Sequence, residues 1–365
     1  MPLVIGLAVL LFTGWFTALA GTAGAAASPP LARFWKALGK QMVQCQLCPR
    51  RCTLGPGQRG VCQARLNVNG ELRTLTYGKP ISMAIDPIEK KPFFHVTPGE
   101  QVFSIATAGC NMRCRFCQNW QISQVAPDEV ETVPLTPQQV VDLAVARKSR
   151  FIVYTYTEPT VFYEYMVDIA KLARARGLKN AMHSCGYINP EPLKELLPYM
   201  DAVDIDLKGF TPDFYRTMGL LAELDPVLAT IRSIKEAGVW LEITNLVIPG
   251  ANDDPADIRR MCEWLKTNCG DEVPLHFSRF MPAFRLRNLP PTPVSKLEEA
   301  RKIAMDVGLK YVYIGNLPGN AYENTFCPGC GKMVIKRVGF VPEELHIRQG
   351  KCEFCGAPIA GRWEF

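Results

Sequence analysis

The sequence predicts an α/β protein in which a parallel sheet lies between two cysteine-bearing modules. Three observations support this prediction. Between residues 99 and 320, segments typical of buried strands alternate about six times with segments of helical period. Eleven of the 14 cysteines fall into three tight groups. The chain has 365 residues, 48% of them hydrophobic, which is enough for about two or three domains with a full core.

Composition excludes several classes of protein. The hydrophobic content excludes intrinsic disorder, and neither a collagen repeat nor a small disulfide scaffold fits the length and glycine pattern. The net charge of +6 is modest, although seven basic and no acidic residues lie between Arg33 and Arg65. We therefore find no strong nucleic-acid signal. Thiols grouped at gaps of two and three residues indicate metal ligands rather than disulfide partners.

The first 32 residues carry no charged side chain, and residues 3–27 are apolar or small. Such a stretch is long enough to cross a hydrocarbon layer of about 30 Å, so we expect a membrane anchor in residues 1–32. The basic residues follow it, which would keep the body of the protein, including any catalytic part, on the cytoplasmic side. Two alternatives remain: a cleaved signal peptide with export, since residues 18–28 are small, or a misassigned start of a cytoplasmic protein.

Residues 41–98 form a cysteine-, glycine- and proline-bearing segment without sustained helical period. We expect a Cys-rich metal-binding module held by its ligands rather than by a core. Its four thiols can bind either zinc or a second iron-sulfur cluster that relays electrons, and their spacing does not choose between the two. These ligands are Cys45, Cys48, Cys52 and Cys62.

The core, residues 99–320, is expected to contain a repeated strand-helix unit. The predicted strands are 102–106, 151–155, 179–183, 202–206, 239–247, 275–280 and 311–314. The predicted helices are 136–147, 160–176, 191–199, 224–237, 255–267 and 295–307. Right-handed crossovers would build either an open doubly wound sheet or a closed or partial barrel. Both place their chemistry at the carboxyl ends of the strands.

Three cysteines directly follow the first predicted core strand: Cys110, Cys114 and Cys117. Three thiolates on one loop can bind three irons of a 4Fe-4S cluster and leave the fourth iron open to a substrate or cofactor. The alternatives are a zinc loop completed by a distant ligand, or buried thiols without metal.

The tail, residues 321–365, contains two pairs of cysteines, each pair separated by two residues. Two such knuckles about twenty residues apart predict a zinc ribbon, with iron as the alternative metal. A module of this size needs such a metal for stability. The ligands are Cys327, Cys330, Cys352 and Cys355.

The central triad and the strand-helix pattern resemble the radical S-adenosylmethionine (SAM) superfamily. Further motifs resemble the AmmeMemoRadiSam system radical SAM enzymes, relatives of pyruvate formate-lyase activating enzyme, over residues 41–365. These are Cys45-Gln-Leu-Cys48-Pro-Arg-Arg-Cys52, Asp86-Pro-Ile-Glu-Lys-Lys-Pro92, Gly109-Cys110-Asn111, Cys117-Gln118-Asn119-Trp120 and Tyr156-Thr-Glu158-Pro-Thr160. The resemblance implies a partial (β/α)6 TIM-like barrel between the N-terminal Cys-rich module and the C-terminal zinc ribbon.

It also implies an oxidoreductase-type activity. A 4Fe-4S cluster would cleave SAM reductively to a 5'-deoxyadenosyl radical, which abstracts hydrogen from an unidentified substrate. The resemblance assigns the SAM amino group to Glu158, the pocket lining to Asp206 and Lys208, and the ribose side to Gly250. Ser184 at the third strand end and His276 on the sixth strand are further candidates. Cys185 departs from the family's asparagine and is expected to be a small buried residue.

Two other functions remain open. The chain could activate a glycyl radical enzyme, or it could be a non-catalytic electron-transfer or zinc-binding protein. The resemblance implies an electron donor such as flavodoxin or ferredoxin, with Memo-type and AMMECR-type proteins as candidate partners.

Overall fold

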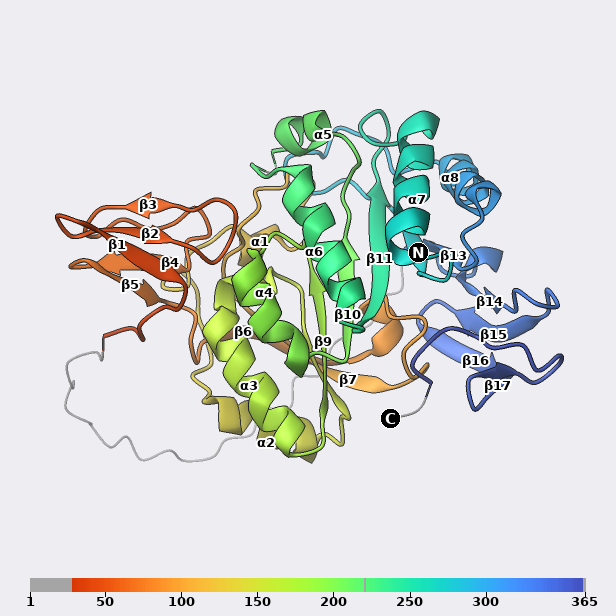
Figure 1. The fold of residues 1–365 in the computed structure, drawn as a ribbon, viewed down its shortest axis with the longest axis horizontal. Coiled ribbons are helices and arrows are strands. Elements are labelled where there is room, and N and C mark those ends of the chain that lie inside the picture. Colours follow the sequence, from red (N-terminus) through yellow and green to blue (C-terminus); the bar gives the residue numbers. More distant parts are fainter. Residues whose placement is uncertain (1–27, 220, 364–365) are drawn as a thin grey trace, which may run out of the picture.

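The computed structural model describes residues 28–219 and 221–363, and an eight-stranded mixed sheet forms its centre (Figure 1). Seven consecutive strands, β7 to β13, run parallel, and β6 pairs antiparallel with β7. Their bounds are β6 Pro80–Pro87, β7 Gln101–Thr107, β8 Phe151–Tyr154, β9 Lys179–Ser184, β10 Ala202–Asp206, β11 Trp240–Val247, β12 Leu275–Arg279 and β13 Val312–Gly315.

The strand order decides between the two predicted kinds of sheet. Each parallel strand adds beside the one before it, without the reversal that a doubly wound sheet requires. The doubly wound alternative is therefore wrong. Within the described residues, β6 and β13 are the two edges and do not pair, so the sheet is open there.

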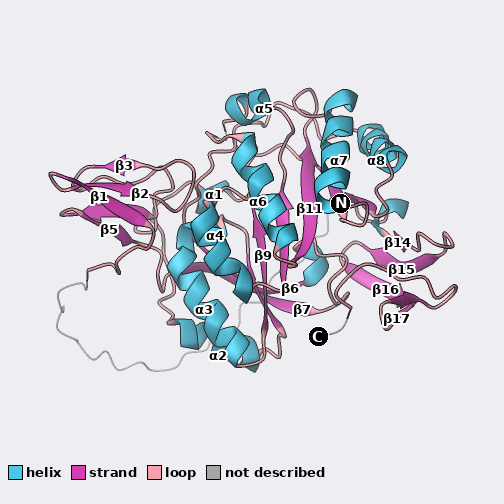
Figure 2. Ribbon diagram, in the orientation of Figure 1, coloured by secondary structure: helices cyan, strands magenta, loops and turns pink. Residues whose placement is uncertain are grey.

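Helices connect the parallel strands, and Figure 2 shows α2, α3, α4, α6 and α7 in front of them. Crossovers between consecutive parallel strands are right-handed as a rule, which brings the helices that follow them to one face of the sheet. The helices are α1 Trp120–Ser123, α2 Pro137–Ala146, α3 Tyr163–Ala175, α4 Pro190–Leu196, α5 Pro212–Thr217, α6 Leu224–Glu236, α7 Pro255–Cys269 and α8 Val294–Val307. Short 3-10 turns are η1 Ile88–Lys90, η2 Pro159–Phe162, η3 Leu197–Tyr199 and η4 Ala321–Glu323.

Local capping explains where two of these helices begin. The Thr136 side chain accepts from the backbone N–H of Gln139, whose own side chain accepts from the N–H of Thr136, a complete capping box. Asp254 caps α7 in a similar way, and each cap is followed by a proline at the first helical position. These signals are readable in the sequence, which is why the predicted starts agree with the structure.

One strand lies where the sequence predicted no part of the core. β6 belongs to residues 41–98, yet it pairs along most of β7, for example Ile85 with Phe103. The residues after it, including Phe93 and Val96, are fully buried against the sheet. The expectation that this whole segment lacks a core is therefore wrong for residues 80–98. The side chains of β6 do not alternate between buried and exposed, so the sequence lacks the two-residue hydrophobic period that would predict a strand here.

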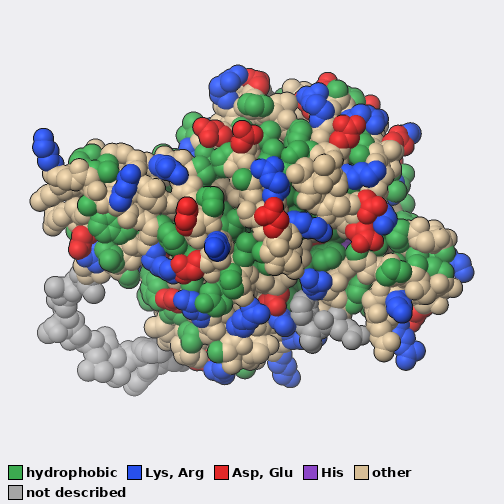
Figure 3. Space-filling model, in the orientation of Figure 1, with side chains coloured by type: hydrophobic (Ala, Val, Ile, Leu, Met, Phe, Trp, Pro, Cys, Tyr) green, Lys and Arg blue, Asp and Glu red, His purple; other side chains and the backbone are tan. Residues whose placement is uncertain are grey.

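Small sheets flank the core at both ends of Figure 1. The N-terminal strands are β1 Trp35–Gly39, β2 Met42–Cys45, β3 Thr53–Leu54, β4 Arg65–Val68 and β5 Glu71–Thr74. The C-terminal strands are β14 Thr325–Phe326, β15 Met333–Val338, β16 Val341–Leu345, β17 Ile347–Arg348 and β18 Lys351–Cys352. On the face drawn in Figure 3, basic and acidic side chains are interspersed.

The described part of the chain contains no helix long and apolar enough to span a bilayer. The predicted anchor in residues 3–27 lies outside the described residues.

Candidate functional site

A cavity of about 550 Å³ opens at the carboxyl ends of the parallel strands. The loop that follows β7 lines it on one side, and the ends of β8, β9 and β10 line the other. Parallel strands present their carboxyl ends at one edge of a sheet, so residues far apart in sequence meet here. Among them are Cys110, Cys114, Cys117, Glu158, Asp206 and Lys208.

The three cysteines of the β7 loop face this cavity together. Cys114 is buried, and Cys110 and Cys117 are partly exposed. Burial, followed by the neighbouring Cys114 thiol and the Glu158 carboxylate, raises the pKa of Cys110 well above its ordinary value. Burial also raises the pKa of Cys114 to about 12, although the Lys208 ammonium opposes this shift. Without a bound cation, these two thiols remain protonated at neutral pH, so metal binding must release their protons.

Glu158 is almost fully buried at the end of β8, and four hydrogen bonds fix its carboxylate. Oε1 accepts from Thr160 N at 3.1 Å, Thr160 Oγ1 at 2.6 Å and Ser184 Oγ at 2.8 Å. Oε2 accepts from Cys185 N at 2.8 Å. Oε2 therefore keeps capacity for a further donor, while Ser184 orients the carboxylate.

A second polar group lies on β9 and β10. His183 Nδ1 lies 2.6 Å from Asp204 Oδ1, and Lys208 Nζ donates to Asp206 Oδ2 at 2.7 Å. Although burial lowers the pKa of an imidazole, the Asp206 and Asp204 carboxylates raise the pKa of His183 to about 10. Burial raises the pKa of Asp204 to about 6 despite the hydrogen bond from His183. At neutral pH the group therefore contains imidazolium, ammonium and two carboxylates.

Asp206 is the more acidic member of that group. Burial alone would raise its pKa, but the Lys208 and His183 cations hold it well below its usual range. Sequence reasoning did not find His183. A lone strand histidine carries no signal by itself, whereas its parallel register with β10 places it directly opposite Asp204.

Of the last two predicted SAM contacts, His276 lines the cavity and Gly250 does not. His276 lines the cavity, but its Nε2 lies 2.7 Å from Glu242 Oε2, and both side chains are buried. Although burial favours the neutral acid, the hydrogen bond from His276 holds the pKa of Glu242 below its ordinary value. Gly250 follows β11 with φ +70° and does not line the cavity.

A buried ion pair at the cavity wall was also missed. Lys91 Nζ lies 2.8 Å from Asp86 Oδ2 and 3.9 Å from the centre of the Tyr156 ring, and Tyr156 donates its hydroxyl to Asp86. Burial lowers the pKa of Lys91 to about 8 despite the Asp86 carboxylate. Asp86 and Lys91 belong to a motif that the sequence analysis quoted without a role. The motif at residues 86–92 could have indicated this ion pair. The pairing of β6 with β7 places the motif beside the core sheet.

The four cysteines of the tail approach one another closely. Their sulfurs all lie within 4.8 Å of one another, with Cys327 and Cys355 at 3.6 Å and Cys330 and Cys352 at 3.9 Å. A tetrahedral ion with metal-sulfur bonds of about 2.3 Å places its sulfurs about 3.8 Å apart. The tail therefore contains a compact four-thiol site that can bind a single metal ion.

Comparison with known proteins assigns a family to this arrangement. Residues 104–264, which include the triad and Glu158, match the model of the Radical SAM superfamily. The chain is also 47% identical over 330 residues to an uncharacterized protein of Methanocaldococcus jannaschii, covering 90% of this chain and 98% of that protein. The chain belongs to the radical SAM superfamily. It is a SAM-dependent iron-sulfur enzyme, and the non-catalytic reading is wrong.

Activating enzymes are more distant members of the same superfamily. This radical SAM chain is 24% identical over 182 residues to the pyruvate formate-lyase-activating enzyme of Listeria monocytogenes, covering 45% of this chain and 69% of that enzyme. A solved domain of the pyruvate-formate lyase-activating enzyme of Bacteroides vulgatus is 21% identical and covers 45% of this chain and 98% of that one, with a TM-score of 0.40.

The superfamily implies a 4Fe-4S cluster and SAM. The donor set around the cavity fits both. Three thiols on one loop suit a cluster that keeps one iron open, and the adjoining carboxylates and ammonium suit the charged methionine end of SAM. Cys185 also lines the cavity and is buried, as the sequence predicted, with its thiol 3.5 Å from Asn111 Oδ1.

Proposed function

We propose that the chain is a radical SAM enzyme of the AmmeMemoRadiSam type that abstracts hydrogen from an unidentified substrate. One observation carries the proposal. The three loop thiols, Glu158 and the Asp206–Lys208 pair line a single cavity at the carboxyl end of the sheet. The AmmeMemoRadiSam assignment rests on the motifs at residues 45–52, 86–92 and 156–160.

In this proposal Cys110, Cys114 and Cys117 hold the 4Fe-4S cluster through three irons. Each thiol must lose its proton on binding, and the Lys208 ammonium favours this at Cys114. When bound, the reduced cluster and SAM together supply a 5'-deoxyadenosyl radical for hydrogen abstraction. The protein then contributes binding, orientation and exclusion of water around that radical.

Glu158 would accept a hydrogen bond from the amino group of SAM through Oε2, the oxygen with spare capacity. Ser184 would act on the cofactor indirectly, as a positioning residue for Glu158. Lys208 would offer its ammonium to the SAM carboxylate while Asp206 holds that ammonium in place. His276 would contact the adenosyl side, and Gly250 would support the ribose only through its turn.

The finer architecture is part of the same proposal. We take the curved array of seven parallel strands as the partial (β/α)6 TIM-like barrel, with the radical SAM core in residues 99–320. Residues 41–98 would form the Cys-rich module, with β6 contributing to the core sheet, and residues 321–365 the zinc ribbon. The compact spacing of the four tail sulfurs supports zinc there. Residues 1–32 stay a proposed anchor or signal segment.

Partners follow from the same chemistry. A one-electron donor such as flavodoxin or ferredoxin must reduce the cluster, and Memo-type and AMMECR-type proteins remain proposed partners. These assignments rest on the family resemblance.

The test is the formation of 5'-deoxyadenosine. Protein purified without oxygen, reduced with dithionite and supplied with SAM should release 5'-deoxyadenosine, and Cys110→Ala should abolish this. The matched control is Cys269→Ala, which removes a buried thiol of α7 that does not line the cavity. Undiminished 5'-deoxyadenosine from Cys110→Ala would refute the proposal.

A second candidate function is activation of a glycyl radical enzyme, which the similarity to pyruvate formate-lyase-activating enzymes favours. It predicts that reduced protein with SAM generates a glycyl radical, visible by electron paramagnetic resonance (EPR), on a glycyl radical protein from the same organism. Release of 5'-deoxyadenosine without any such radical would leave the first candidate alone.

A further inference from the structure

The N-terminal module contains four cysteines that the proposed function does not use. Cys45 ends β2 and is buried, whereas Cys48, Cys52 and Cys62 lie in the following loops and are partly exposed. A Cβ added at Gly60 would lie 3.7 Å from Cys62 Sγ and 3.8 Å from Cys52 Sγ. The two sulfurs therefore border the same small space. Each of the four thiols also lies close enough to influence the other three electrostatically.

The spacing of these sulfurs differs from that of a zinc site. In residues 28–219 and 221–363, the tail cysteines are the only all-cysteine group whose sulfurs lie within 4.8 Å of one another. The N-terminal group is wider than this, and so is the triad of the radical SAM loop. The triad thus serves as an internal reference, because its ligands bind different irons of one cluster. Within the described residues, the N-terminal thiols therefore share with the triad, and not with the tail, the absence of three sulfurs this close together.

A buried cation beside these thiols is a second, independent observation. Arg65 is 1% exposed, and its Nη1 donates to Glu164 Oε1 at 2.6 Å. Its Nε and Nη2 are buried and have no hydrogen-bond partner within the described part of the chain. The thiols of Cys45 and Cys62 are among the groups that act on this guanidinium. Buried donors without acceptors are rare, so Arg65 points to an anionic, acceptor-rich group held by these cysteines.

The N-terminal thiols also lie next to the radical SAM loop. The carbonyl oxygen of Cys62 lies only 2.5 Å from the place where a Cβ on Gly109 would be, and Gly109 has φ +96°. Arg113 donates to the carbonyl oxygen of Val61, and Arg50 donates to that of Asn111. The two cysteine-bearing segments are therefore in direct contact, without an intervening element.

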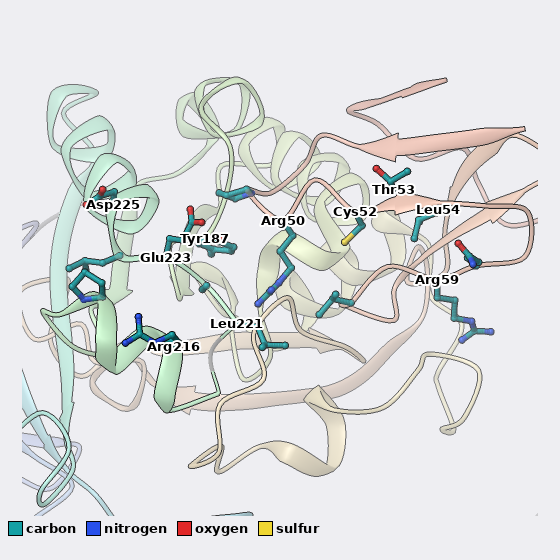
Figure 4. A pocket seen from close by; sticks show the side chains of 16 residues that line it. Arg50, Cys52, Thr53, Leu54, Arg59, Tyr187, Arg216, Leu221, Glu223 and Asp225 are labelled. Carbon is teal, nitrogen blue, oxygen red and sulfur yellow. The ribbon is translucent and has the colours of Figure 1, made fainter. Parts of the chain in front are cut away.

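The module also borders a cavity of about 1150 Å³. Figure 4 shows Cys52 and Arg59 on one wall of this cavity, with Glu223 and Asp225 on the opposite wall. A group bound by the four cysteines would thus border this cavity at Cys52 and the triad loop at Cys62.

We propose that Cys45, Cys48, Cys52 and Cys62 bind a second 4Fe-4S cluster, whose four irons are all ligated by the protein. Its role as a relay rests on the proposed function. A one-electron reductant loses an electron, the second cluster passes through its reduced state and returns to its oxidised one, and the electron reaches the triad cluster. Reductive cleavage of the sulfur-C5' bond of SAM consumes it and leaves methionine and the adenosyl radical.

The test is a metal and sulfide count on full-length protein purified without oxygen. We expect about eight irons, eight sulfides and one zinc per chain. The triple variant Cys110→Ala, Cys114→Ala, Cys117→Ala should keep about four irons. After reduction with dithionite it should show an EPR signal that SAM does not alter.

The reciprocal variant is Cys48→Ser with Cys52→Ser, both at partly exposed positions. It should lose about four irons and keep the SAM-sensitive signal. The matched control, Cys269→Ser, should keep the full complement. If the double variant does not fold, the triple variant alone decides. An iron-free triple variant with about two zincs per chain would overturn the second cluster.

The two proposals fail in different ways. If native protein contains about eight irons but no signal responds to SAM, the proposed function fails while the second cluster stands. If a SAM-sensitive signal accompanies only about four irons, the second cluster fails while the proposed function stands.

Discussion

Glu158 accepts three hydrogen bonds on one carboxylate oxygen and one on the other. Because the side chain is almost fully buried, this uneven distribution fixes both the position of the carboxylate and the direction of its remaining lone pair. Oε2 is the oxygen that keeps capacity for a further donor. The residue therefore suits recognition of an ammonium group better than acid-base chemistry.

The first prediction concerns that oxygen. Glu158→Gln removes the charge while keeping the shape, so SAM binding should weaken about 10- to 100-fold, as expected for loss of a charge-assisted hydrogen bond. Calorimetric titration of the reconstituted protein with SAM measures this, and the iron content should not change. Glu131→Gln, at an exposed position, is the control. Equal affinity in the two variants would exclude Glu158 from SAM binding.

The second prediction concerns pH. The folded-state pKa of His183 is raised to about 10, so the unfolded chain loses this proton first as pH rises. The stabilisation is fully present below about pH 6.5 and disappears as pH rises through about 10. The difference in melting temperature between native protein and His183→Gln should therefore shrink across this window. A melting-temperature difference that is constant from pH 6 to 11 would show that His183 is not held as an imidazolium in the folded protein.

The contact between His183 and Asp204 could not be predicted from either residue alone. The triad was predictable because its spacing is local and chemically restrictive. The partner of His183, Asp204, is 21 positions away, and only the β9–β10 register brings the two together. Glu158, Asp206 and Lys208 were predicted from the resemblance, and the structure adds the hydrogen bonds that orient them.

At the scale of elements, β6 positions a buried ion pair that the repeating strand-helix pattern does not contain. The Asp86 carboxylate lies among Lys90, Lys91 and the Tyr156 hydroxyl. Burial alone would raise its pKa, but hydrogen bonds from these groups hold the pKa of Asp86 well below its usual range. The edge strand is therefore attached to the core by charge as well as by its ladder with β7.

The third prediction tests this attachment. Asp86→Asn leaves the buried Lys91 ammonium without its carboxylate and should lower the free energy of unfolding by about 3–5 kcal/mol. The control is Asp128→Asn, which breaks an exposed pair with Arg59 and should cost less than about 1 kcal/mol. Urea unfolding measures both. Similar small losses in the two variants would show that the Asp86 pair does not stabilise the sheet.

The parallel core was largely predictable from the sequence, because hydrophobic period and helix caps are local signals. The predicted helix 136–147 corresponds to α2, and the predicted strand 202–206 coincides with β10. α5 was missed because six residues do not display a helical period. β6 was missed because its partner strand is set by tertiary pairing and not by its own pattern.

At the scale of the whole molecule, the tail is joined to the cavity wall. Arg337 donates to the carbonyl oxygen of Phe94 at 2.7 Å, and its Nε lies 3.9 Å from Glu89 Oε1. Burial raises the pKa of Glu89 to about 7 despite the Arg337 guanidinium. The backbone N–H of Thr97 donates to the carbonyl oxygen of Arg362 at 2.8 Å. The tail therefore supplies a hydrogen-bond acceptor to the segment that follows β6.

The fourth prediction follows from that joint. Removal by a chelator of the metal proposed for the tail, or Cys352→Ser, should loosen residues 325–363 and expose the Thr97 amide. Hydrogen exchange at Thr97 should become on the order of tenfold faster, while amides of α7 keep their rates. Unchanged exchange at Thr97 would show that the tail docks without its metal.

Phe340 is a second place where the tail meets the cavity. It lies in the two-residue turn between β15 and β16, yet it lines the cavity built by the core sheet. Part of the cavity lining is thus supplied by a hairpin that adds no strand to that sheet. Exchange of this hairpin alone can therefore change the shape of the cavity, while the strands of the core sheet are left untouched.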